Sequence, residues 1–268
     1  MLSRSDFAER FGRHAVFGMV HLQPLPGAPR FGGSIDTVIE SAINDARGLA
    51  AGGCDGVVFE NFGDRPFRKH VDAETIAAMT RVIADVARDL RLPFGVNVLR
   101  NDARAALAIA AATGAQFIRI NIHIGAMLTD QGIIEGKAAD TLRQRASFAP
   151  HVLIFADHLV KHASVIGEVD AMQMAKDLRE RGLADALIIS GRETGAPAEL
   201  GRFSRTRKAV DAPILVGSGL TAENAADYTD ADGAIVGTSV KREGRVEMPV
   251  DPMRVERVVR AFKQLVAR

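Results

Sequence analysis

Two short turns built from glycine and hydroxyl residues follow the last two apolar runs of the chain. Small residues let backbone N–H groups approach an anion closely, and Ser and Thr hydroxyls can donate further hydrogen bonds to its oxygens. The turns therefore predict a binding site for a phosphorylated small molecule. The residues expected to hold the phosphate are Gly217, Ser218, Gly219, Gly237 and Thr238.

Polar side chains alternate with isoleucines over residues 118–123. Because side chains alternate across a strand, the isoleucines suit a face covered by helices, and Arg119, Asn121 and His123 are expected to point into the mouth of a barrel. A buried charge at that place needs a partner or a ligand. Two compatible interpretations stay open: Arg119 contacts the substrate, or it forms a structural ion pair with Glu60.

Two carboxylates stand at the ends of other apolar runs. Glu60 closes residues 56–60, and Asp157 follows residues 152–156. Both are candidates for a general acid and base, or for oxygen ligands of Mg²⁺, and the sequence leaves these roles open. The Cys and His spacings that are typical of zinc sites do not occur, so zinc is not expected.

Two basic residues complete the candidate catalytic set. His21 ends the first apolar run and either serves the site or is satisfied by the Pro-rich loop of residues 23–29. Lys161 follows Asp157 by four residues and is a candidate cation for a phosphate or carboxylate. It is also a candidate Schiff-base nucleophile, a role that needs a desolvated amine.

The loop of residues 190–197 is bounded by glycines and carries both charge signs, which is typical either of a mobile lid or of a plain surface loop. Polar residues that follow the apolar runs suit contacts with a substrate at the strand ends of a barrel. The remaining expected substrate contacts are Asn97, Ser190 and Thr194.

Eight apolar runs alternate with eight helical patterns, which predicts a (β/α)8 TIM barrel of the phosphate-binding type. No G-x-G-x-x-G follows the first run, which disfavours an open doubly wound sheet, and no nicotinamide or flavin cofactor is expected. The expected strands are residues 16–20, 56–60, 94–98, 117–121, 152–156, 186–190, 214–216 and 234–236.

A chain of 268 residues matches the roughly 250 residues of one such barrel, so we expect a single domain over residues 1–268. Residues 1–14 are expected to form an N-terminal cap, with a short helix at residues 5–13 that closes the bottom of the barrel. Helix starts are expected at Asp36, Asp72, Asn101 and Thr221, which could each serve as an N-terminal cap.

Composition limits the partners. The chain has 34 Lys and Arg against 33 Asp and Glu, so its net charge of +1 gives no global field to attract nucleic acid. No apolar run reaches the length of a membrane span, and the first residues lack the apolar core of a signal peptide, so we expect a cytoplasmic protein. We also expect a homo-oligomer. Cys54 is the only cysteine, so no disulfide forms within the chain.

Motifs over nearly the whole chain resemble those of the BtpA/SgcQ family of barrel proteins. The more specific strings are His-Leu-x-Pro-Leu-Pro-Gly at residues 21–27 and Asn-Val-Leu-Arg-Asn-Asp at residues 97–102. Further matching motifs lie at residues 19–22, 53–56, 60–61, 117–121, 156–157, 161–162, 190–191, 194–195, 216–221 and 233–238.

The resemblance implies a barrel fold and two different roles. The family takes its name from photosystem I biogenesis, which implies a non-catalytic assembly factor, whereas a relative encoded among sugar-uptake and sugar-phosphate epimerase-like genes suits carbohydrate metabolism. The converging polar residues favour an enzyme that isomerises, cleaves or hydrolyses a phosphorylated sugar or a related metabolite. A nucleotide or nucleoside processing enzyme is a third alternative, which would use Phe31, Phe62 or Phe67 as a stacking surface.

Overall fold

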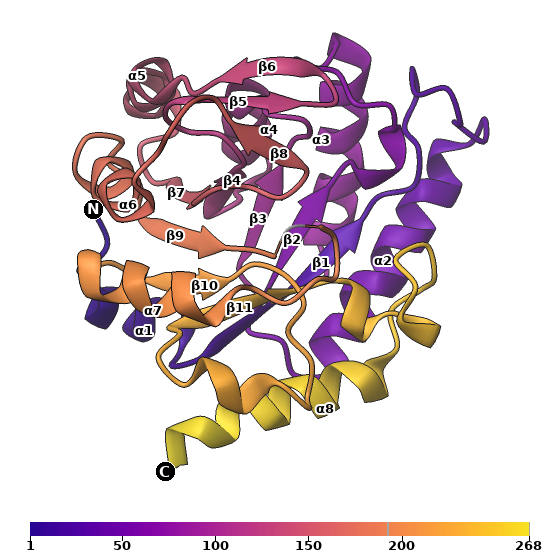
Figure 1. Ribbon diagram of the computed structural model, residues 1–268. Coiled ribbons are helices and arrows are strands. Elements are labelled where there is room, and N and C mark those ends of the chain that lie inside the picture. Colours follow the sequence, from indigo (N-terminus) through magenta and orange to yellow (C-terminus); the bar gives the residue numbers. More distant parts are fainter. Residues whose placement is uncertain (192, 268) are drawn as a thin grey trace.

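Eight parallel strands close into a barrel in the computed structural model, which describes residues 1–191 and 193–267 (Figure 1). Around the barrel the strands follow the order β1-β11-β10-β9-β7-β4-β3-β2. Their bounds are β1 (Ala15–His21), β2 (Gly56–Glu60), β3 (Phe94–Asn97), β4 (Phe117–Ile120), β7 (Leu153–Asp157), β9 (Ala186–Ile189), β10 (Ile214–Val216) and β11 (Gly233–Val236). The predicted TIM barrel is therefore confirmed, with all eight strands at the expected places.

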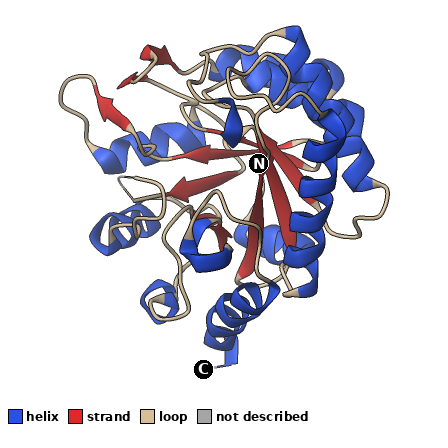
Figure 2. Ribbon diagram, turned by 90° about the vertical axis from the view of Figure 1, so that its right-hand side faces the viewer, coloured by secondary structure: helices blue, strands red, loops and turns tan. Residues whose placement is uncertain are grey.

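Helices surround the strands on the outside of the barrel (Figure 2). They are α2 (Ile35–Ala51), α3 (Ala73–Ala87), α4 (Ala103–Thr113), α5 (Ala138–Phe148), α6 (Ala171–Glu180), α7 (Leu200–Ala209) and α8 (Pro252–Lys263). Short 3-10 turns occupy Phe62–Asp64, Ala225–Tyr228, Thr238–Val240, Arg242–Gly244 and Gln264–Ala267. Among the described residues, no helix is long and apolar enough to cross a membrane.

Three of the four expected helix starts were wrong. Ser34 rather than Asp36 caps α2, and Asp102 rather than Asn101 caps α4. After β10 a 3-10 turn with Asn224 at its N-cap position stands in place of the expected α-helix, although the Thr221 hydroxyl accepts hydrogen bonds from the backbone N–H groups of Glu223 and Asn224. Asp72 does occupy the N-cap position of α3, although its side chain accepts no capping hydrogen bond there.

Aromatic side chains fill the amino-terminal end of the barrel. Helix α1 (Arg4–Phe11) buries Phe7 and Phe11 against the inward-facing rings of β1, β4 and β7. The rings of Phe117 and Phe155 stack with their centroids 4.4 Å apart. Two residues further along the same strands stand Arg119 and Asp157, so the barrel interior changes from apolar at the bottom to charged at the top.

A second sheet of three strands lies beside the carboxyl ends of the barrel strands, and the sequence did not reveal it (Figure 1). Its strands are β5 (Ala126–Thr129), β6 (Gly132–Glu135) and β8 (Ala163–Val165), in the order β6-β5-β8. Met127 and Ile134 of this sheet pack with Ile122 and Val160 in a small separate core. The sheet thereby fixes the segment that leads from β7 to Lys161, directly before β8.

The closing role of α1 predicts a large loss of stability for Phe7→Ala. Phe7 is fully buried, and truncation of a buried phenylalanine typically costs about 3–5 kcal/mol because it leaves a cavity. Urea unfolding measures the change. The matched control is Phe148→Ala in α5, which is 43% exposed and should cost less than about 1 kcal/mol. Equal losses in the two variants would show that α1 does not close the barrel.

Candidate functional site

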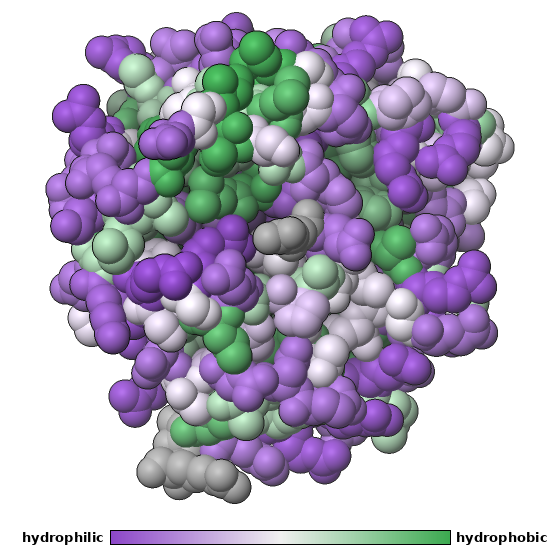
Figure 3. Space-filling view, viewed as in Figure 1, coloured by the Kyte–Doolittle hydropathy of each residue, from purple (hydrophilic) through white to green (hydrophobic). Residues whose placement is uncertain are grey.

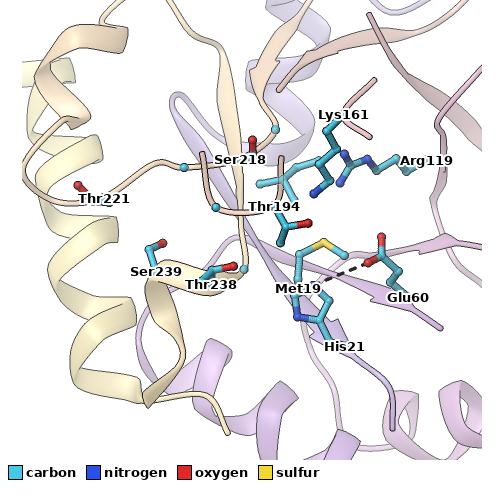
Figure 4. Close-up of a pocket in the computed structure, with 15 residues that line it drawn as sticks. Met19, His21, Glu60, Arg119, Lys161, Thr194, Ser218, Thr221, Thr238 and Ser239 are labelled. Carbon is cyan, nitrogen blue, oxygen red and sulfur yellow. Dashed lines mark ion pairs between the residues drawn. The ribbon is translucent and has the colours of Figure 1, made fainter. Parts of the chain in front are cut away.

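A cavity of about 200 Å³, here called the inner lobe, opens among residues that follow the barrel strands (Figure 4). A cavity of about 550 Å³, the outer lobe, shares Glu60, Lys161, Thr194 and Thr238 with it. The inner lobe is lined by Met19, His21, Glu60, Arg119, Lys161, Thr194, Gly195, Gly217, Ser218, Gly219, Thr221, Ile235, Gly237, Thr238 and Ser239. Most of the candidate residues from the sequence therefore face one continuous space.

The two glycine-hydroxyl turns lie side by side along the inner lobe (Figure 4). Within the described residues, no hydrogen bond occupies the backbone N–H of Gly219, Thr238 or Ser239. Gly219 has a φ of +69°, and a Cβ there would lie 2.4 Å from the Ala196 carbonyl. Only glycine fits this position without moving the neighbouring loop. A small residue is therefore needed here for packing against that loop, as well as for close approach of an anion to the backbone.

The Ser218 hydroxyl was expected to donate to a phosphate, but in the structure it bonds within the protein. Its hydroxyl donates to the carbonyl of Ala196 at 2.9 Å and accepts from the N–H of Gly191 at 3.0 Å. Since the proton of this hydroxyl is already engaged, Ser218 holds the loop of residues 190–197 against the barrel. Within the 237–239 turn, the Thr238 and Ser239 hydroxyls face the lobe instead (Figure 4).

The 190–197 loop forms one wall of the site through Thr194 and Gly195. Nε2 of His162 accepts from the N–H of Thr194 at 3.3 Å and lies 3.0 Å from the Thr194 hydroxyl. The loop is thus tied both to the barrel and to the segment before β8. Arg192, which belongs to the same loop, lies outside the described residues.

A buried ion pair crosses from β4 to β7. Nε and Nη2 of Arg119 donate to the two carboxylate oxygens of Asp157 at 3.0 and 2.9 Å, and both side chains are almost fully buried. Asn121 donates to Asp157 at 2.7 Å, and the Ser190 hydroxyl does so at 3.4 Å. The expected pair of Arg119 with Glu60 is therefore wrong, because Asp157 on the adjacent strand offers a bidentate acceptor.

Five candidate residues do not line the inner lobe, and four of them line neither lobe. Asp157 is enclosed by its donors, and Ser190 supports it. Asn97 donates to the carbonyl of Arg119 at 3.1 Å, which leaves it in the network below the cavity. His123 donates to the carbonyl of Gly182 at 2.7 Å and does not point into the mouth, because the chain leaves the strand register after Ile120. Asn121 lines the outer lobe.

Glu60 is the carboxylate that faces the cavity. No hydrogen bond engages its oxygens among the described residues, and its nearest basic neighbour is Nε2 of His21, 3.8 Å from Oε1 (Figure 4). Burial raises the pKa of Glu60 above the ordinary glutamate value, although Arg119 and Lys161 oppose that shift. A carboxyl group of this kind can exchange a proton with a bound molecule at a pH closer to neutral.

Lys161 faces Glu60 from the other side of the cavity (Figure 4). Burial, together with the positive charge of Arg119, lowers the pKa of its ammonium to about 8. Its backbone carbonyl accepts from Nη2 of Arg100 at 2.7 Å, which helps to hold the segment in place. Lys161 is therefore a partly buried amine rather than a fully solvated one, and both of the roles considered for it stay chemically open.

His21 is buried beside Glu60 and is not satisfied by the Pro-rich loop. Its Nδ1 is buried without a hydrogen-bond partner, and its ring lies 4.7 Å from that of Phe62. Burial and the nearby Lys241 and Lys161 push its pKa well below the ordinary histidine value, so the imidazole is neutral. A neutral imidazole next to a carboxyl group can donate or accept a hydrogen bond but adds no charge to the site.

The cavity offers few side chains that could act as ligands of Mg²⁺. The described residues contain no group of three or more His, Cys, Asp or Glu side chains that could hold a metal ion. Asp157, one of the two expected ligands, already accepts from Arg119, Asn121 and Ser190. Of the two expected ligands, Glu60 alone then lines the inner lobe.

Some lining residues were missed by sequence reasoning. Met19 lines the inner lobe, and Arg100 lines the outer lobe. Ser239, which also lines the inner lobe, belongs to the second of the two glycine-hydroxyl turns expected from the sequence. Arg100 lies within the string at residues 97–102 that carried the family resemblance, so the signal for it was present. Beside His21, Lys241 forms a buried ion pair with Asp45.

The closed strands, surrounding helices and polar cavity at the strand ends define a TIM-barrel protein. The chain belongs to the BtpA family, whose model matches residues 12–264. It is 44% identical to the photosystem I biogenesis protein BtpA of Synechocystis, over 97% of this chain and 92% of that protein. It is also 43% identical to an uncharacterized protein of Thermococcus kodakarensis, over 95% of this chain and 97% of that protein.

Solved structures similar to this chain are TIM-barrel enzymes. The geranylgeranylglyceryl phosphate synthase of Thermoplasma acidophilum, solved with sn-glycerol-1-phosphate, has a TM-score of 0.61 at 15% identity and covers 98% of this chain and 99% of its own. The phosphoribosyl anthranilate isomerase of Thermus thermophilus has a TM-score of 0.59 at 9% identity, with 94% of this chain and 99% of its own covered. These similarities establish the fold.

The buried pair predicts that Asp157→Ala will destabilise the protein strongly. Removal of one partner leaves the Arg119 guanidinium buried without its counter-charge, which typically costs about 3–5 kcal/mol. The free energy of unfolding, from urea titration, measures the effect. As a control, Glu199→Ala breaks an exposed pair with Arg205 and should change stability by less than about 1 kcal/mol. A loss for Asp157→Ala as small as that of the control would contradict the structural role of the pair.

Proposed function

We propose that the chain is an enzyme that acts on a phosphorylated sugar or a related small metabolite by proton transfer. The observation that carries this proposal is the placement of buried Glu60 and partly buried Lys161 in a cavity that also contains the two glycine-hydroxyl turns. The two groups have opposite charges, and neither has a direct ion-pair partner. Buried titratable groups with shifted pKa values are typical of catalytic sites. The structural similarity to barrel enzymes agrees with an enzyme but does not identify the reaction.

The phosphate would bind to the unoccupied N–H groups of Gly219, Thr238 and Ser239, with the hydroxyls of the second turn as further donors. This assigns the anion to the turns expected from the sequence, with Ser218 as the anchor of the covering loop. The reacting end of the molecule would then lie between Glu60 and Lys161, because both border the same lobe.

Glu60 would serve as the general base. In an isomerisation or aldol step, its carboxylate takes a proton from a carbon or hydroxyl of the substrate, and the electron pair moves onto a carbonyl oxygen. Protonated Lys161 stabilises the negative charge that develops on that oxygen, in a site where burial strengthens the interaction. Neutral His21, whose Nε2 lies 3.8 Å from Oε1 of Glu60, adds no charge beside the carboxylate.

A non-catalytic assembly role is the second candidate, and one surface favours it. Exposed aliphatic side chains gather over the three-stranded sheet and the segment after it, in the upper part of Figure 3. Such patches are typical of protein contacts. The exposed side chains of this patch include Leu128, Ile133, Val165, Ile166, Val169 and Met172. The relative named for photosystem I biogenesis agrees with this alternative. A homo-oligomer and a cytoplasmic location remain predictions.

Calorimetric titration with a panel of sugar phosphates, followed by turnover assays of those that bind, tests the enzyme proposal. We expect Glu60→Gln to keep the affinity for the bound compound and to lower kcat by about 10²–10⁴, because the amide cannot accept the proton. The control Glu135→Gln, on the exposed part of β6, should leave kcat unchanged. Full turnover by Glu60→Gln would refute the catalytic role. A panel without any binding would favour the assembly role.

The pH dependence of kcat/KM should be bell-shaped. Its rising limb follows deprotonation of Glu60 and lies above the ordinary glutamate range, because burial raises that pKa. Its falling limb lies near pH 8, where Lys161 loses its proton and its stabilising charge. In Lys161→Arg the guanidinium stays charged throughout, so the falling limb should disappear from this range. A falling limb that is unchanged in that variant would assign it to another group.

A further inference from the structure

The outer lobe contains space and side chains that the proposed phosphate site does not use. It shares Glu60, Lys161, Thr194 and Thr238 with the inner lobe and extends beyond them to residues that do not line the inner lobe. Apolar side chains form part of its wall, among them Phe67, Leu99 and Val246. A molecule that fills both lobes would therefore have its phosphate at one end, its reacting centre in the middle and a further group in the outer lobe.

Arg100 is a buried charged group that lines this outer lobe. Arg100 is only 4% exposed, and its side chain forms no ion pair within the described part of the chain. One guanidinium nitrogen, Nη2, donates to the carbonyl of Lys161 at 2.7 Å, whereas Nε is buried without a partner. A buried guanidinium without a counter-charge is costly, so a cavity that contains one favours an anionic ligand.

Other charged groups of the outer lobe do not neutralise Arg100. Asp157, Asp130 and Glu60 act on it electrostatically without forming an ion pair with it, and Asp157 is already paired with Arg119. Asp130 is exposed, and its carboxylate accepts from the neighbouring Gln131 side chain. Arg65 adds a further positive charge besides those of Arg100 and Lys161, and its guanidinium lies 4.6 Å from the centre of the Phe62 ring.

We infer that the substrate carries a second anionic group, a carboxylate or a phosphate, which binds Arg100 in the outer lobe at the end opposite its first phosphate. This inference rests on the proposed function and deepens it. The planar guanidinium matches the geometry of either anion. A nucleobase stacked on Phe62 fits less well, because His21 and Arg65 already lie against that ring. The favoured class is an elongated phosphorylated sugar acid or a bisphosphate.

Calorimetry with matched pairs of compounds tests this inference. Glucose 6-phosphate is compared with 6-phosphogluconate, and fructose 6-phosphate with fructose 1,6-bisphosphate, on the wild-type protein, Arg100→Gln and the control Arg88→Gln, whose side chain is exposed. At least one doubly anionic compound should bind the wild type about tenfold or more tightly than its partner, as a charge-assisted contact would give. In Arg100→Gln this preference should fall to within about threefold, with the affinity for the singly phosphorylated partner unchanged.

The outcomes separate the inference from the function on which it rests. A preference for 6-phosphogluconate alone identifies a carboxylate, and one for the bisphosphate alone identifies a phosphate. Binding of the single phosphates without any preference, or a preference that survives in Arg100→Gln, overturns the inference and leaves the proposed function standing. Failure of all four compounds to bind overturns both. If Arg100→Gln does not fold, Arg100→Lys replaces it and should weaken the preference.

Discussion

The bidentate ion pair of Arg119 with Asp157 is the interaction on which the upper half of the barrel depends. It joins two neighbouring strands in a region from which water is excluded. Two buried charges are tolerated there only if their geometry and remaining hydrogen bonds are good. Asn121 and Ser190 supply such hydrogen bonds to the carboxylate, which explains why the ends of several strands carry polar residues that no ligand needs to touch.

The pair of Arg119 with Asp157 also affects the charge environment of Glu60 and Lys161, which face the cavity. Because Asp157 takes the guanidinium of Arg119, Glu60 is left without an ion-pair partner of its own in the cavity. Burial then raises the pKa of Glu60, while burial and the positive charge of Arg119 lower that of Lys161. Two groups with pKa values displaced in opposite directions form a pair that can move protons near neutral pH.

The loops contribute in a different way. Ser218 uses its hydroxyl to hold the 190–197 loop, and the small second sheet anchors the segment that contains Lys161. The phosphate donors of the proposed site would be backbone N–H groups and the hydroxyls of the 237–239 turn, which need no charged side chain. Positive charge is placed instead at Lys161, which lines both lobes, and at Arg100, which lines the outer lobe.

The amino-acid sequence by itself determined the barrel, because strand and helix periodicities are local properties of the chain. It also placed most of the lining residues, since side chains at strand ends meet at one end of a barrel. Only the tertiary structure decided that Arg119 pairs with Asp157 rather than Glu60, that His123 turns away and that Ser218 anchors a loop. These contacts depend on which strands are neighbours and on the paths of the loops. Both are determined by residues that are distant in the sequence, so no local sequence pattern predicts them.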